Sequence, residues 1–136
     1  MALAIERKQP PGVNVRMQQG KPAYSHVVTV NGPGKTIYIA GQLGRDLDGN
    51  IVGGGMRAQM EQTFKNLDAC LKAADATWAD VVKTNTFVTD YEEFAKNTDV
   101  RMRYFGVASP TSTTVQISRL AQEGAMVEIE MIAVVA

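Results

Sequence analysis

The sequence predicts an α+β fold in which a mixed sheet carries two helices on one face. Three features predict it: short β-branched runs bounded by turn residues, one long stretch with helical spacing, and a second helical stretch between two later strand-like runs. The expected order is β-β-(β)-α-β-α-β-β, in a single domain over residues 1–136. Residues 1–20 contain Pro-Pro-Gly and few periodic apolar positions, so they are expected to form an arm or a short edge strand.

The first half of the chain predicts a β-hairpin. β-Branched residues are frequent from Tyr24 to Val30, and the Asn-Gly-Pro-Gly sequence at 31–34 is typical of a tight turn. The returning strand is expected at Ile37–Ala40. Residues 41–55 are expected to form a loop that has room for a short strand at 51–52.

Helical spacing begins near Met56. Apolar residues then recur at intervals of three and four, which predicts an amphipathic helix of about five turns that ends around Ala74. The members of this apolar stripe are Met60, Phe64, Leu67 and Leu71. A β-branched strand is expected at Val81–Val88.

The segment after this strand predicts a second helix. Asp90 is suited to be its N-cap, the helix is expected to run to about Phe105, and Gly106 can end it. The last two strands are expected within SPTSTTVQISRL and MVEIEMIAVVA, joined by a short turn.

The C-terminal strand places two carboxylates in an apolar run. Side chains alternate along a strand, so Glu128 and Glu130 lie on one face, roughly 6–7 Å apart, together with Ile132 and Val134. A glutamate in such a face is solvated, paired or kept for chemistry, and Arg119 is a candidate partner. The opposite face is continuously apolar, through Val127, Ile129, Met131, Ala133 and Val135. Because two helices cover only one side of the sheet, the mixed side is expected to pack against further copies of the chain.

Composition narrows the range of partners. The chain has 14 Lys plus Arg and 14 Asp plus Glu without a basic stripe, which argues against nucleic acid. No apolar run approaches the roughly 20 residues of a membrane span, and the charged N-terminus is unlike a secretory signal. A single cysteine favours the cytoplasm, and one His with one Cys argues against a metal site.

Several motifs together resemble the RidA (YjgF) family of reactive-intermediate deaminases. They are AYSHVV, YIAGQLGRDLDGNIVGG, NLDACLKAADAT, DVVKTNTFVTDYEEFAKNTDVRMRYF and MVEIEMIAVV, which span nearly all of residues 24–135. The resemblance implies a chorismate-mutase-like fold and a homotrimer whose sheets form a central barrel, with sites in the clefts between subunits. It implies hydrolysis of enamines and imines to a 2-keto acid and ammonia, and no cofactor.

The sequence departs from the deaminase pattern at the substrate site. The family's deaminases carry an arginine that clamps the substrate carboxylate, and Ser112 occupies its position here. A hydroxyl cannot replace a bidentate guanidinium. Thr114 stands where a cysteine is frequent, and Ala40 stands where a serine precedes Gly-Gln. The positions that match are Tyr24, Ser25, Gly41 and Glu128.

These positions define the candidate site. The resemblance implies that Glu128 positions the attacking water, whereas the alternative is a charge that pairs across an interface. The expected substrate-binding residues are Tyr24, Ser25, Ala40, Gly41, Ser112, Thr114 and Arg101. Arg101 is one of four cations that could replace the missing clamp, the others being Arg45, Arg103 and Arg119.

Two functional hypotheses follow from these residues. The first is a trimeric hydrolase or deaminase that acts on a small imine, enamine or related C–N compound other than 2-aminoacrylate. The second is a non-catalytic protein of the same family that binds a metabolite or acts as a chaperone. Loss of the clamp motivates the second hypothesis, and substitution of Glu128 separates the two.

Overall fold

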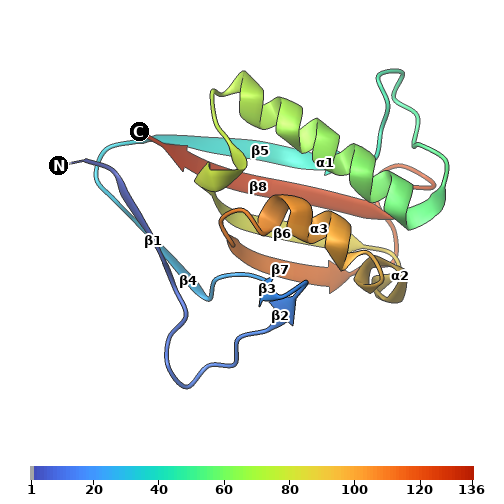
Figure 1. The fold of residues 1–136 in the computed structure, drawn as a ribbon. Coiled ribbons are helices and arrows are strands. Elements are labelled where there is room, and N and C mark those ends of the chain that lie inside the picture. The colour runs from blue at the N-terminus through green and yellow to red at the C-terminus, as the bar shows by residue number, and fades with distance from the viewer. Residues whose placement is uncertain (1) are drawn as a thin grey trace.

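A computed structural model describes residues 2–136 (Figure 1). Its helices are α1 (Gly55–Ala73), α2 (Tyr91–Ala95) and α3 (Thr98–Phe105), with a 3-10 turn at Trp78–Asp80. Its strands are β1 (Ala4–Lys8), β2 (Met17–Gln18), β3 (Lys21–Pro22), β4 (Val27–Asn31), β5 (Lys35–Leu43), β6 (Val81–Val88), β7 (Thr111–Gln116) and β8 (Val127–Val135).

A four-stranded mixed sheet forms the centre, in the order β5-β8-β6-β7. β6 and β7 run parallel, whereas β8 is antiparallel to both β5 and β6. The helices cover one face of this sheet, so the α+β class predicted from the sequence is confirmed (Figure 1). The predicted short turn between the last two strands is wrong, because β6 lies between β7 and β8 and residues 117–126 connect them.

The predicted hairpin between the first two strands is also wrong. β4 pairs with β1 in a separate antiparallel ribbon, and this ribbon extends away from the sheet that contains β5 (Figure 1). Arg7 on β1 holds the ribbon to the turn before β6, because its Nη2 donates to Ala79 O at 2.8 Å and to Val81 O at 3.2 Å. β4 therefore pairs with β1 and not with β5, the strand that was expected to return beside it.

The apolar stripe predicted for the first helix is confirmed as the centre of the core. Met60, Phe64 and Leu67 are fully buried, and they belong to one cluster with Ile129 and Met131 on β8. Aromatic rings extend this cluster, since Phe64 stacks on Tyr104 with centroids 4.6 Å apart. Burial of these side chains supplies the main driving force that holds α1 on the sheet.

The predicted second helix is divided into α2 and α3. Asp90 is the N-cap, as expected, and its carboxylate accepts from Glu93 N at 3.1 Å. The break occurs at Asn97, which has φ −117° and ψ 34°, and its Nδ2 donates to Glu93 O at 2.8 Å. Asparagine side chains compete for backbone hydrogen bonds in this way, and they are therefore unfavourable inside a helix.

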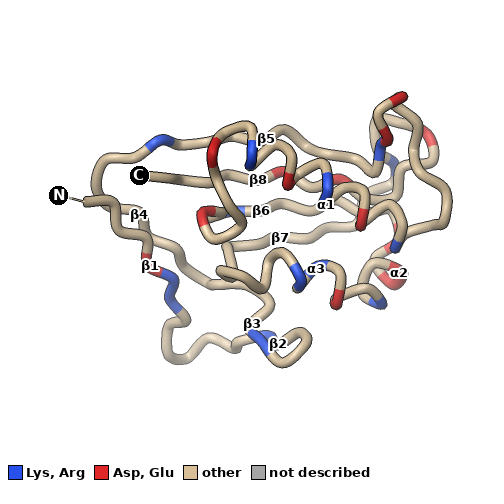
Figure 2. The backbone as a smooth tube through the Cα atoms, turned by 45° about the horizontal axis from the view of Figure 1, so that its top comes forward, with Lys and Arg blue, Asp and Glu red and all other residues tan. Residues whose placement is uncertain are grey.

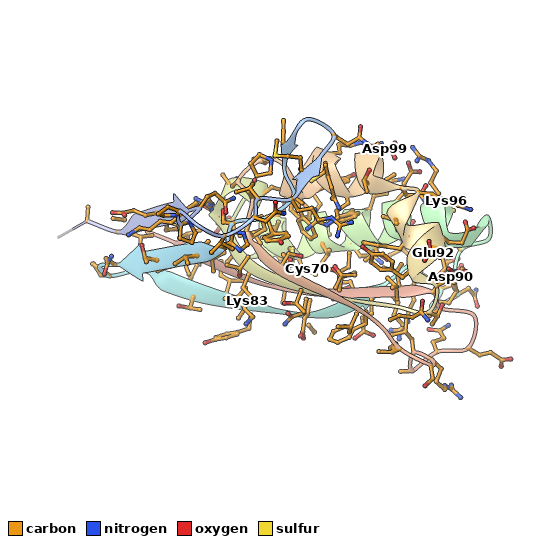
Figure 3. The ribbon with its side chains drawn as sticks, turned by 90° about the horizontal axis from the view of Figure 1, so that it is seen from below. Cys70, Lys83, Asp90, Glu92, Lys96 and Asp99 are labelled. Carbon is orange, nitrogen blue, oxygen red and sulfur yellow. The ribbon has the colours of Figure 1, made fainter. Side chains whose placement is uncertain are left out.

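The face of the sheet opposite the helices is open and mixed. Glu128, Glu130 and Ile132 are half-buried on this face, whereas the alternate residues of β8 from Val127 to Ala133 are buried beneath the helices. Lys83 lies on the open side, away from Asp99 of α3 and from Lys96, which follows α2 (Figure 3). Tyr38 on β5 is 78% exposed. The sheet therefore presents a surface that no element among residues 2–136 covers.

Charges of both signs are interspersed along the helices rather than collected into one stripe (Figure 2). Across residues 2–136, none of the helices is long and apolar enough to cross a membrane.

Candidate functional site

A pocket of about 160 Å³ lies between β7, the α2–α3 pair and the segment that precedes β4. It gathers four of the sequence-predicted site residues, which are Tyr24, Arg101, Ser112 and Thr114. Arg16, Gln18, Ala23, Tyr91 and Phe94 complete its lining.

Strand alternation directs the two β7 hydroxyls toward this pocket. Ser112 and Thr114 pair in register with Thr84 and Thr86 of β6. Those two threonines are buried on the helix side of the sheet, and directly paired residues point to the same face. The hydroxyls of β7 therefore face α3, whereas Thr113 between them points the other way and is exposed.

Arg101 enters the pocket from α3 and is only 3% exposed. Its Nη1 donates to Ala23 O at 2.8 Å and to Gln18 Oε1 at 3.0 Å, and its Nη2 donates to Ser112 Oγ at 3.1 Å. The guanidinium carbon also lies 5.3 Å from the ring centroid of Phe105. Burial lowers the pKa of Arg101 to about 10, which leaves the side chain charged near neutral pH.

Tyr24 and Ser25 differ in whether they can contact a bound ligand. Ser25 is buried, its hydroxyl donates to Ser109 O, and its N–H donates to Pro110 O at 3.2 Å. These bonds tie the chain before β4 to the turn before β7. The Tyr24 ring borders the pocket and meets His26 edge to face at 5.3 Å.

Glu128 lies over a bulge in the neighbouring strand. The register between β5 and β8 shifts between Ile39 and Gln42. Two residues of β5, Ala40 and Gly41, therefore lie opposite a single residue of β8. A Cβ built on Gly41 would lie 2.7 Å from Cδ and 2.9 Å from Cγ of Glu128. Glycine at this position therefore makes room for the carboxylate side chain.

The predicted site residues form two separate groups in one chain. Glu128 pairs with Phe87, and the residues of β6 that share its face lie on the open side of the sheet. Ser112 and Arg101 lie on the helix side, at the β7 edge, whereas Gly41 belongs to β5 at the other edge (Figure 1). None of the four main pockets among residues 2–136 contains members of both groups.

The other candidate cations have different partners. Arg45 donates to Gln122 Oε1 at 2.6 Å, and Arg103 lies 3.9 Å from Glu61 on α1. The expectation that Arg119 pairs with a β8 glutamate is not met, because its Nε donates to Leu120 O at 3.1 Å. Among residues 2–136, Glu128 and Glu130 form no ion pair, and Glu130 accepts from Asn85 at 3.2 Å.

Sequence reasoning missed the contribution of the N-terminal segment. Arg16 and Gln18 reach the pocket because β2 and β3 form a small hairpin around Gln19 and Gly20, both of which have positive φ. Two consecutive residues with positive φ are the signature of a tight hairpin turn. The Gln-Gly pair was the one feature of the sequence that indicated this turn, although no periodic apolar residues flank it. Among residues 2–136, no cluster of three or more His, Cys, Asp or Glu could hold a metal ion.

A family model described as "Endoribonuclease L-PSP" matches residues 18–135 of this chain. The chain therefore belongs to that family, which is the RidA/YjgF family indicated by its motifs.

Named relatives and solved structures agree with this assignment. A rat protein named 2-iminobutanoate/2-iminopropanoate deaminase is 37% identical over 113 residues, which cover 82% of this chain and 80% of the rat protein. A RutC family protein of Pyrococcus abyssi is 36% identical, with 81% and 84% covered. The Rid family protein YyfB of Yersinia pestis has a TM-score of 0.80 at 28% identity, covering 96% and 98% of the two chains. RidA of an Antarctic Psychrobacter has a TM-score of 0.68 at 33% identity, covering 89% and 98%.

Proposed function

We propose that this protein is a hydrolase that deaminates a small imine or enamine in clefts between subunits of a homotrimer. The observation that carries the proposal is the division of the site into two groups on different faces and edges of one sheet. A second copy of the chain can bring the Glu128 group of one subunit to the Arg101–Ser112 group of the next. Several relatives named as imine deaminases support the reaction class.

The open face of the sheet supports self-association. Tyr38, Ile132 and Lys83 border a concavity of about 390 Å³ on this face, and its apolar side chains would leave water if sheets from other copies packed against it. A trimeric barrel, as the family resemblance implies, would cover this face. The free thiol of Cys70 is consistent with a cytoplasmic location for such an assembly.

Glu128 acts as the acid and base in the proposed reaction. Its carboxylate takes a proton from water and passes it to the imine nitrogen while the water oxygen bonds to the imine carbon. The resulting carbinolamine carries a hydroxyl and an amine on one carbon. Glu128 then moves the hydroxyl proton to that amine, the C–N bond breaks, and the products are a carbonyl compound and ammonia. An enamine enters the same route after it tautomerises to the imine.

The alternative is a non-catalytic member of the family that binds a metabolite. Ser112 favours this alternative, because it occupies the position from which deaminases of the family extend their clamping arginine. The two candidates differ in what Glu128 does. In the enzyme it transfers protons, and in the binding protein it only shapes the cleft.

The substitution Glu128→Gln tests the proposal. We expect ammonia release from imino acids generated in situ to fall by about 100-fold or more, since an amide cannot take up the proton. Binding of a non-reactive carboxylic acid should change little. The matched control is Glu130→Gln, on the same strand and face, which should keep most of the activity.

Full turnover in Glu128→Gln would contradict the assigned role of this residue. If the wild-type protein binds imino acid analogues but releases no ammonia from any imino acid tested, the binding-protein alternative replaces the enzyme.

A further inference from the structure

We propose that the pocket around Arg101 selects a short dicarboxylate, with one carboxylate on Arg101 and Ser112 and the other on Arg16. This inference rests on the proposed function, because it assigns a substrate class to the same site. It also explains why a serine, Ser112, can occupy the position of the missing clamp on β7: the positive charge comes instead from Arg101 on α3.

The first observation is that Arg101 is a buried cation without an anionic partner. Its recorded oxygen partners are neutral: Ala23 O, Gln18 Oε1 and Ser112 Oγ. None of the ion pairs among residues 2–136 includes Arg101. A buried charge that lacks a counter-charge is unfavourable in the folded state, so a bound carboxylate would supply what the protein omits.

The guanidinium also has donors to spare. It carries five N–H groups, and Nη2 donates one of its two to Ser112 while Nε has no recorded protein partner. None of the Arg101 nitrogens is among the sealed, unpartnered polar atoms of residues 2–136. Nε therefore keeps some accessible surface, and the edge that it forms with Nη2 is one through which a guanidinium binds a carboxylate by two parallel bonds.

Arg16 places a second positive charge at the rim of the same pocket. It is exposed, it lines the pocket, and none of the ion pairs in the described part of the chain includes it. Its charge contributes to the lowered pKa of Arg101, after the larger effect of burial. Two like charges in one pocket repel each other, and a ligand with two negative charges relieves both.

The walls and the size of the pocket limit the ligand further. Tyr24, Tyr91 and Phe94 supply flat aromatic surfaces to the pocket that both cations line. The volume of about 160 Å³ is well below the roughly 300–1,000 Å³ that is typical of sites for drug-sized ligands. A short, planar carbon chain with a carboxylate at each end matches these dimensions and charges.

Binding of two non-reactive acids tests this inference independently of turnover. Fumarate and crotonate have the same carbon chain and differ in a single terminal carboxylate. We expect isothermal titration of the full-length wild-type protein to show at least about tenfold tighter binding of fumarate. In Arg16→Gln the affinities should become similar, chiefly through weaker fumarate binding. Arg103→Gln, on α3 but paired with Glu61 outside the pocket, should keep the wild-type ratio.

Equal affinities in the wild type, no binding of either acid, or a fumarate preference that survives Arg16→Gln would each overturn the inference. Failure of the proposed function looks different. In that case fumarate is preferred and the preference depends on Arg16, but no imino acid yields ammonia. Conversely, deamination of 2-iminopropanoate and 2-iminosuccinate at equal efficiency would support the enzyme and reject the dicarboxylate.

Discussion

Gly41 lies beside Glu128, so an alanine substitution at Gly41 tests where the Glu128 side chain lies. The space that a Cβ would occupy is filled by the Glu128 side chain, with Cδ at 2.7 Å. The carboxylate therefore depends on a neighbour that has no side chain, and the bulge in β5 brings that neighbour beneath it.

We predict that Gly41→Ala displaces the carboxylate and lowers ammonia release at least about tenfold. The added methyl should also destabilise the protein by about 1–3 kcal/mol, as overpacking does. Urea unfolding measures the stability, and the Gly53→Ala variant, where the added methyl meets no atom within 4 Å and φ is not positive, controls for the loss of glycine flexibility alone. Wild-type turnover in Gly41→Ala would show that Glu128 does not need its present position.

Arg101 shows what residue-level reasoning could and could not predict. The sequence identified it among four cations that could replace the clamp, because a missing charge suggests a substitute. Only the structure distinguishes it, since the hydrogen bond to Ser112 depends on how α3 packs against β7. Arg16 carried no signal of its own, because its approach depends on a hairpin of two-residue strands.

For the elements, local periodicity predicted where helices and strands occur in the sequence. It did not predict which strands lie side by side in the sheet. The helix from Gly55 to Ala73 and the strand from Val81 to Val88 agree with the sequence because their patterns are long and regular. The two predicted hairpins failed because strand adjacency depends on distant segments. β6 lies between β7 and β8, and β4 pairs with β1 instead of β5.

The break between α2 and α3 shapes the pocket around Arg101. It lets Phe94 on α2 and Arg101 on α3 line one pocket. Asn97 stabilises the break, since its side chain donates to Glu93 O and accepts from Arg57 at 3.2 Å.

We predict that Asn97→Ala lowers the free energy of unfolding by about 1–2 kcal/mol, because it removes two partly buried hydrogen bonds of the buried Asn97 side chain. It should also weaken fumarate binding, since the relative position of the two helices changes. Thermal and urea unfolding with isothermal titration measure both effects. The adjacent Lys96→Ala, which removes an exposed ion pair with Glu93, should change stability by less than about 0.5 kcal/mol. Unchanged stability and binding in Asn97→Ala would remove the role assigned to the break.

In the whole molecule, the candidate site residues of one chain are divided between two places on the sheet. Glu128 and Gly41 lie toward one edge of the sheet and face its open side, whereas Ser112 lies at the other edge and faces Arg101 of α3. Sequence analysis predicted most members of both groups, because the motifs name the residues. It did not predict which group each residue joins, since that follows from strand order.

Subunit complementation tests whether the two groups of the site come from different chains. Glu128→Gln and Arg101→Lys each disable one group, and each variant alone should show little ammonia release from 2-iminosuccinate generated in situ. After the two variants are unfolded together and refolded as a 1:1 mixture, random trimers should contain both intact groups in about a quarter of their clefts. We therefore expect recovery of about a quarter of wild-type activity. Activity no greater than that of the separately refolded variants would contradict it, because both groups would then have to come from the same chain.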